Sequence, residues 1–169
     1  LAVLEANPHG VDLGPMKPRI PEVLRTPTGK IEVAPERVVT DVARLRRSLD
    51  HANGGMALIG RRDLRSNNSW MHNIPLLVNG KPRCTLQIHP RDAERLELGP
   101  GDLAKVESAT GSIVIPVELC DSMMPGVVSI PHGWGHTDGG IRLSVAREHA
   151  GVNSNLLAST EALDRPSGT

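Results

Sequence analysis

The sequence predicts a mainly β domain with short helices, folded as a compact β-barrel behind a proline-rich arm. Apolar and polar side chains alternate from Cys84 to His89, the period of a strand with one buried face. Turns containing glycine or proline then recur at short intervals and divide the chain into further short apolar segments. No apolar stretch reaches the roughly 18 residues of a membrane-spanning helix, so the 169 residues are interpreted as one globular domain with an arm.

Residues 1–52 are predicted to form a proline-rich arm and a helix that lead into the domain, which comprises residues 53–169. Six prolines in the first 35 residues exclude a long helix and a central strand there, and leave residues 30–33 as a candidate edge strand. Residues 38–49 are predicted to be an amphipathic helix. Its apolar stripe consists of Val38, Val42, Leu45 and Leu49, and its solvated face carries Arg44, Arg46 and Arg47.

The domain is predicted to begin with a buried strand. A glycine-containing break at residues 53–55 precedes a continuous apolar run over residues 56–59. Pro90 near the start and Gly99 as the stop delimit a later short helix. The further predicted elements are a strand over residues 84–88, that helix over residues 90–98, strands over residues 103–108 and 113–119 joined by a hairpin, and a strand over residues 127–130.

Residues 98–106 resemble the Gly-Asp box of cradle-loop and double-psi β-barrels. Gly99 and Gly101 allow a tight crossing of the chain, and Asp102 can accept hydrogen bonds from nearby backbone N–H groups. An ordinary type II turn is the alternative interpretation. With the order strand, short helix, turn, hairpin and strand, this segment predicts a double-psi β-barrel of the aspartate-decarboxylase-like kind, with six strands between residues 56 and 157.

Composition and motifs argue against several classes of protein. Lys and Arg total 19, as do Asp and Glu, so the chain lacks the basic excess of a nucleic-acid-binding module. The two cysteines, Cys84 and Cys120, lie far apart, which argues against a disulfide framework or a zinc site. No secretory leader is recognisable, and a cytoplasmic location is expected. GxSxG, GxGxxG and P-loop motifs are absent, and no catalytic residue is assigned.

A long polar loop after the first predicted strand is the main candidate binding segment. Residues 59–73 hold three arginines, three asparagines and two serines. Arginine suits bidentate contact with phosphate oxygens, and asparagine and serine can hydrogen-bond the edges of a heterocycle. A solvated loop of local turns is the alternative. The candidate cofactor-binding residues are Gly60, Arg61, Arg62, Arg65, Ser66, Asn67, Asn68, Ser69, Trp70, Met71, His72 and Asn73.

Two further segments are candidate ligand contacts. In residues 131–136, two histidines have the four-residue spacing of helical metal ligands, but the neighbouring glycines oppose a helix and no third ligand is adjacent. Hydrogen bonding by neutral imidazole is therefore expected, and no metal ligand is assigned. In residues 151–157, asparagines either contact a ligand or cap a helix. The candidates are His132, Gly133, Trp134, Gly135, His136, Asn153 and Asn155.

The two tryptophans are the only large aromatic residues of the chain, which has no Phe and no Tyr. Trp70 and Trp134 both lie in polar, glycine- or asparagine-containing segments rather than in apolar runs. We therefore predict that both rings face a ligand site and not the core of the barrel.

Several short motifs occur in the order and spacing of one protein family. They are Gly60-Arg61, Asn68-Ser69-Trp70-Met71, residues 88–93 leading into Gly101-Asp102, residues 124–128, His132-Gly133-Trp134-Gly135, and Asn155-Leu156-Leu157. Together they resemble the C-terminal domain of the bis-molybdopterin guanine dinucleotide oxidoreductases, which include formate dehydrogenases, nitrate reductases and dimethyl sulfoxide reductases. Residues 9–15 are similar to the segment that precedes this domain in formate-dehydrogenase-like members.

This resemblance implies a double-psi β-barrel that binds molybdopterin guanine dinucleotide, with molybdenum or tungsten carried by the pterins. It implies that residues 60–73 contact pterin and phosphates, and that residues 131–136 and 153–155 contact the pterins. The metal ligand and any iron–sulfur cluster would belong to other domains of a longer enzyme that transfers electrons or an oxygen atom. The isolated chain is expected to be inactive, and its expected partners are those domains and an electron-transfer subunit.

Two other functions of double-psi barrels are alternatives. An interaction or adaptor module without a redox role, as in AAA ATPases, does not predict the polar loop with its arginines, asparagines and tryptophan. A self-processing decarboxylase would need cleavage at a Gly-Ser bond. Gly111-Ser112 is such a bond, but it lies where a hairpin turn is predicted.

Overall fold

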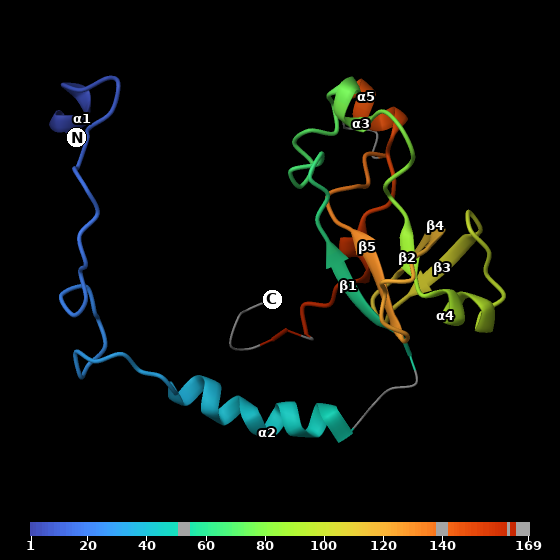
Figure 1. Ribbon diagram of the computed structural model, residues 1–169, viewed down its shortest axis with the longest axis horizontal. Helices are drawn as coiled ribbons and strands as arrows, with labels where there is room; N and C mark the ends of the chain where they lie inside the picture. The colour runs from blue at the N-terminus through green and yellow to red at the C-terminus, as the bar shows by residue number, and fades with distance from the viewer. Residues whose placement is uncertain (51–54, 138–141, 162, 165–169) are drawn as a thin grey trace. The chain divides into compact units, whose positions relative to one another are not determined.

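The computed structural model describes residues 1–50, 55–137, 142–161 and 163–164, in two compact units (Figure 1). The first unit is Leu1–Leu49 and the second is Asp50–Thr169. Helix α1 spans Ala2–Glu5, and α2 spans Glu36–Asp50, which confirms the predicted helix. The strand predicted over residues 30–33 is wrong. No strand of the described residues pairs with this segment. A strand is stabilised by hydrogen bonds to a neighbouring strand, and residues 30–33 have no such neighbour.

Five strands form the sheet of the second unit, close to the positions that alternation and turns predict. Their bounds are Ala57–Arg61 (β1), Leu86–Ile88 (β2), Leu103–Glu107 (β3), Ser112–Leu119 (β4) and Val127–Pro131 (β5). They pair in the order β1-β5-β2-β4-β3. β1 is parallel to β5 and β2 is parallel to β4, whereas β2–β5 and β3–β4 are antiparallel. The mainly β class with short helices is therefore confirmed.

The sheet is open, so the predicted closed, six-stranded double-psi barrel is not confirmed. β1 and β3 are the outer strands and do not pair with each other. The described residues contain five strands rather than six. Alternation and turn residues specify local strands and hairpins, whereas closure depends on pairing between strands distant in sequence, which local patterns do not encode.

β1 is not buried as predicted. Its residues 57–60 are all exposed, and Leu58 and Ile59 keep 41% and 50% of their accessible surface. The apolar run does form a strand, but that strand lies at the edge of the sheet, where β5 is its one strand neighbour.

The Gly-Asp turn forms as predicted. Asp102 Oδ2 accepts a hydrogen bond from the Gly99 backbone N–H at 2.7 Å, and the Asp102 carbonyl accepts one from Val117 at 2.8 Å. The Asp102 side chain thus closes the turn, and its backbone carbonyl is hydrogen-bonded to β4. The predicted hairpin is also present, because the Ser108 N–H donates to the Gly111 carbonyl at 2.9 Å between β3 and β4.

Aliphatic side chains fill most of the core, as the absence of Phe and Tyr requires. Buried and exposed residues alternate along most of β4, and Ile115 at its centre is fully buried. One of the two tryptophans, Trp134, packs among them. The buried core cluster comprises Cys84, Leu86, Ile88, Ala93, Ala104, Ile113, Ile115, Val117, Val128, Ile130, Trp134 and Leu157.

Short helices lie at both ends of the sheet. The predicted helix after β2 is present as α4 (Pro90–Arg95), and His89 Nδ1 caps it by accepting from the Arg91 N–H at 3.0 Å. The other helices are α3 (Pro75–Val78), α5 (Ser144–Glu148) and the 3-10 helix η1 (Ser154–Leu157). α3 and α5 lie together at one end of the sheet, and α4 lies at the other end (Figure 1). Among the described residues, no helix has the length and apolar character needed to cross a bilayer.

Candidate functional site

The parallel pairing of β1 with β5 determines where the polar loops begin. Arg61, the last residue of β1, lies opposite Pro131, the last residue of β5. The His132 N–H continues the ladder by donating to the Arg61 carbonyl at 3.3 Å. Because both strands end at the same edge, residues 62–73 and residues 132–136 leave the sheet side by side.

The two loops are in direct contact through Asn68. His132 Nε2 lies 2.8 Å from Asn68 Oδ1, and Arg62 donates to the same oxygen at 3.3 Å. Gly133 adopts a positive φ of 87°, and a Cβ there would collide with the Asn68 carbonyl oxygen. Only glycine therefore allows the second loop to approach the first this closely.

The third predicted segment joins the same assembly. Gly135 packs against Asn153, where an added Cβ would meet the Asn153 Cβ at 2.6 Å. The Gly135 N–H donates to the Ala150 carbonyl at 2.8 Å. Asn153 Oδ1 accepts from the Asn155 N–H at 3.0 Å and so caps η1, one of the two roles expected for it. The structure thus brings all three candidate segments together.

Asn73 has a structural role at this end of the sheet. Its Oδ1 accepts hydrogen bonds from the backbone N–H groups of Val145 and Ala146, at 3.1 and 3.3 Å. These groups lie in the first turn of α5, where N–H groups lack helical partners. Asn73 therefore fixes α5 to the first loop.

A buried histidine pair lies beneath the loops. His72 is fully buried, and its Nδ1 lies 2.7 Å from Nε2 of His136, which is 8% exposed. The His72 ring stacks on Trp134 with centroids 4.0 Å apart. Burial, followed by the charges of His136 and Arg83, lowers the pKa of His72 to about 4, and burial also lowers the pKa of His136. Both rings are therefore neutral near pH 7, and one donates an N–H to the other.

Three buried polar atoms of these loops have no hydrogen-bond partner among the described residues: Ser66 Oγ, His72 Nε2 and Trp134 Nε1. Each such atom costs about 1–3 kcal/mol unless something pairs with it. Trp134 Nε1 is a donor, and His72 Nε2 can act as one. Ser66 Oγ can donate or accept. These atoms are suited to a polar heterocyclic ligand or to ordered water.

Arg61 points into the protein rather than to the loop surface. Its guanidinium donates to the carbonyls of Ser129, Arg83 and Thr85, at 2.8, 3.1 and 2.9 Å, and to Thr85 Oγ1 at 2.8 Å. Burial lowers the pKa of Arg61, and the charge of Glu118 opposes that shift. Arg61 therefore ties the end of β1 to β5 and to the segment before β2.

The outward-facing cations of the first loop are Arg62 and Arg65. They line an open depression of about 460 Å³ together with Lys81 and Arg83, which sequence analysis did not single out. Lys81 pairs with Glu118 at 3.1 Å, and Arg83 pairs with Asp63 at 3.4 Å. The sequence signal for these two was the pair of basic residues on either side of Pro82, just before β2.

A second open depression adjoins the first. It has a volume of about 440 Å³, and its lining consists of Arg62, Asp63, Leu64, Asn67, Asn68 and Met71. Asn67 and Asn68 both adopt positive φ, at 42° and 63°, which turns this loop sharply. The loop thus presents amide and guanidinium groups on an open surface.

The remaining candidates differ in exposure. Trp70 keeps 81% of its surface exposed, outside the core as predicted. Trp134 packs in the core cluster, so the prediction that its ring does not face the core is wrong. Gly60 has open space around its Cα, with nothing within 4 Å of an added Cβ. Within the described residues, no group of three His, Cys, Asp or Glu side chains could hold a metal ion.

A protein family described as "Molydopterin dinucleotide binding domain" matches residues 56–169. This chain belongs to that family. Its cofactor is accordingly molybdopterin guanine dinucleotide with molybdenum, and the resemblance inferred from the motifs is confirmed. The matched range includes the whole sheet and all three loop segments of this molybdopterin dinucleotide-binding domain.

Three curated relatives belong to reductases. A tetrathionate reductase subunit of Salmonella typhimurium is 37% identical over 67 residues, which are 40% of this chain and 7% of the relative. The molybdopterin-containing subunit of the arsenate respiratory reductase of Chrysiogenes arsenatis is 32% identical over 46% of this chain and 10% of its own length. A putative dimethyl sulfoxide reductase catalytic subunit of Halobacterium salinarum is 35% identical over 41% and 8%.

Acetylene hydratase from Pelobacter acetylenicus has a similar fold, with a TM-score of 0.62 over 85% of this chain. The two sequences are 20% identical, so this similarity concerns the fold alone, and the chain covers 22% of the hydratase. The matched segments also make up a tenth or less of each reductase subunit. The domain therefore corresponds to a small part of its relatives.

Proposed function

We propose that this domain holds the dinucleotide of the cofactor on the surface formed by residues 60–73, 131–136 and 153–155, within a longer molybdenum oxidoreductase. When bound, the cofactor supplies a metal centre for electron or oxygen-atom transfer. The residues of this chain bind and orient it. The observation that carries the proposal is the contact of His132 with Asn68, through which loops 64 residues apart form one polar surface.

Charge on this surface favours a diphosphate. Arg62 and Arg65 face solvent and line the larger depression, to which Lys81 and Arg83 add positive charge. Guanidinium groups form strong, charge-assisted hydrogen bonds with phosphate oxygens. Arg62 and Arg65 are therefore the proposed phosphate contacts. Arg61 is proposed to act indirectly, by holding the end of β1 in place.

Polar and flat groups beside these cations favour a heterocycle. Asn67, Asn68 and His132 offer donors and acceptors for ring nitrogens and carbonyls. The exposed Trp70 offers an apolar face for stacking. The unpartnered atoms of Ser66, His72 and Trp134 lie beneath the same loops and are suited to a ligand rich in hydrogen-bonding groups.

We also propose that the assembled domain is a closed double-psi barrel and that the whole protein is formate-dehydrogenase-like. The turn closed by Asp102 and the parallel pairs β1–β5 and β2–β4 support the first statement. Residues 9–15 support the second.

Cofactor content of the full-length protein tests the phosphate contacts. Arg62→Gln removes a charge-assisted contact worth about 1.5–3 kcal/mol, so affinity should fall roughly 10- to 150-fold. Molybdenum and the GMP released by hydrolysis should both decrease. The control, Arg91→Gln, changes an exposed arginine of α4 at the opposite end of the sheet and should leave both unchanged. Equal content in wild type and Arg62→Gln would place the phosphates elsewhere.

A further inference from the structure

Glu118 of β4 lies beside the larger open depression without lining it. Its Oε1 accepts a hydrogen bond from Lys81 Nζ at 3.1 Å, and Lys81 does line the depression, together with Arg62, Arg65 and Arg83. An acidic side chain outside all three loops thus holds one of the cations of the candidate phosphate site.

The carboxylate of Glu118 is anchored independently of Lys81. Its Oε2 accepts hydrogen bonds from Thr85 Oγ1 at 2.6 Å and from Gln87 Nε2 at 3.4 Å, and the guanidinium of Arg61 lies 4.0 Å away. The hydrogen bond from Thr85 lowers the pKa of Glu118, and burial opposes that shift, so the carboxylate is charged near pH 7. If Lys81 moved away, this charge would keep its hydrogen bonds and a nearby cation.

Lys81 is the member of the pair that is able to change partners. Its side chain is 81% exposed, whereas that of Glu118 is 29% exposed. An exposed lysine pair contributes little stability, because water screens it and a long side chain loses entropy in it. Arg83 is different, since its side chain is 13% exposed, donates to the Leu77 carbonyl and pairs with Asp63.

We infer that Lys81 is a third phosphate contact, which leaves Glu118 for a phosphate oxygen when the dinucleotide binds, and that Glu118 is the positioning residue of Lys81. Binding then replaces one ion pair by another, and no covalent bond or proton changes place. Glu118 holds the ammonium group beside the depression before binding and competes with phosphate for it. The inference rests on the proposal that this depression takes the diphosphate.

Titration of the cofactor-free full-length protein with inorganic pyrophosphate, followed by calorimetry, tests the exchange. Glu118→Gln keeps an acceptor for Thr85 but removes the charge that competes for Lys81. Pyrophosphate should therefore bind about three- to tenfold more tightly to this variant. A purely structural role of Glu118 would weaken binding instead. Unchanged or weaker binding by Glu118→Gln would overturn the inference.

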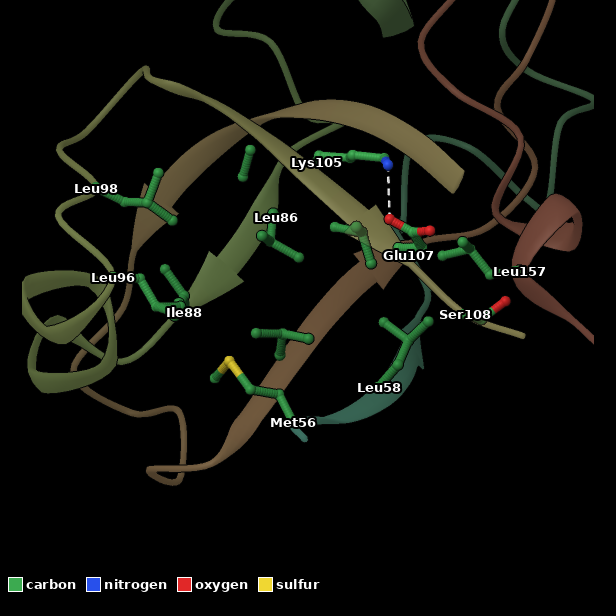
Figure 2. Close-up of a pocket in the computed structure, with 13 residues that line it drawn as sticks. Met56, Leu58, Leu86, Ile88, Leu96, Leu98, Lys105, Glu107, Ser108 and Leu157 are labelled. Carbon is green, nitrogen blue, oxygen red and sulfur yellow. Dashed lines mark ion pairs between the residues drawn. The ribbon is translucent and has the colours of Figure 1, made fainter. Parts of the chain in front are cut away.

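A second lysine–glutamate pair provides the matched control. Figure 2 shows Lys105 and Glu107 of β3, which pair at 2.6 Å beside a separate cavity and do not line the depression. Glu107→Gln changes the net charge of the protein by the same amount as Glu118→Gln and should leave pyrophosphate binding unchanged. An equal gain in both variants would show that net charge alone is responsible, which contradicts a specific role of Glu118.

A double-mutant cycle tests whether Glu118 acts through Lys81. Lys81→Gln changes an exposed side chain, and it should weaken pyrophosphate binding about fivefold by removing a charged contact. Adding Glu118→Gln to this variant should change affinity by less than about twofold, because no ammonium group remains to be released. A full gain in the double variant would overturn the inference, since Glu118 would then act on the ligand without Lys81.

Arg62→Gln separates a failure of this inference from a failure of the proposed function. Weaker pyrophosphate binding by Arg62→Gln, with no gain in Glu118→Gln, would mean that the depression takes phosphate and that only the exchange of partners is wrong. Equal binding by wild type and Arg62→Gln would mean that the phosphate site itself is wrong, and the inference would be overturned with it.

Discussion

Arg61 joins the end of β1 to β5 and to the segment before β2. From the end of β1, its guanidinium reaches carbonyls in β5 and in the segment before β2. The sequence predicted a cation at the end of a strand. It did not predict that the side chain points into the protein, because this depends on acceptors 22 to 68 residues away. Asp102 differs: its partner is Gly99, three residues away, and local sequence was sufficient to predict the contact.

Arg61→Ala should destabilise the domain by roughly 2–4 kcal/mol, because it leaves several buried acceptors without a donor. Urea denaturation measures this loss. Arg62→Ala is the control, since Arg62 is exposed and makes one long hydrogen bond, and it should change stability by less than about 0.5 kcal/mol. A domain equally stable in both variants would show that the Arg61 contacts do not hold the strands together.

The buried pair of His72 and His136 predicts a pH dependence of stability. The pKa of His72 is about 4 in the folded chain, below its ordinary value of 6.5, so the unfolded chain takes up the proton first as pH falls. Stability should be fully present above pH 6.5 and decline towards pH 4, by up to about 3 kcal/mol. Urea denaturation across this range should show the decline, and His72→Phe should reduce its slope. A flat profile for the wild type would contradict the neutral pair.

At the scale of elements, the register between β1 and β5 sets the geometry of the candidate site. The apolar run at residues 56–59 predicted a strand correctly, but its burial depends on neighbours that the run itself does not specify. Helices α3 and α5 were not predicted, because four or five residues are too few to show a helical period. The convergence of the three loops likewise depends on long-range pairing.

Gly133→Ala tests the contact between the loops. A methyl group there would collide with the Asn68 carbonyl, and the positive φ alone costs about 1–2 kcal/mol for other residues. The domain should lose at least that stability in thermal unfolding, and the cofactor content of the full-length protein should fall. Gly55→Ala is the control, because an added Cβ there meets nothing within 4 Å. Loss in both variants, or in neither, would argue against a specific contact.

At the scale of the whole molecule, the central claim is that one face of this domain binds the dinucleotide. Motif order was sufficient to predict the family, because the motifs span the length of the matched range. It was not sufficient to predict that the sheet is open, with β1 and β3 as its outer strands.

Amide hydrogen exchange of the full-length protein, compared between its cofactor-loaded and cofactor-free forms, tests this claim most directly. Residues 62–73 and 132–136 should exchange more slowly in the loaded form, because ligand contacts order polar loops. Helix α4, at the other end of the sheet, should exchange equally in both forms. Loops whose exchange is the same with and without cofactor would contradict the claim, and so would a difference confined to α4.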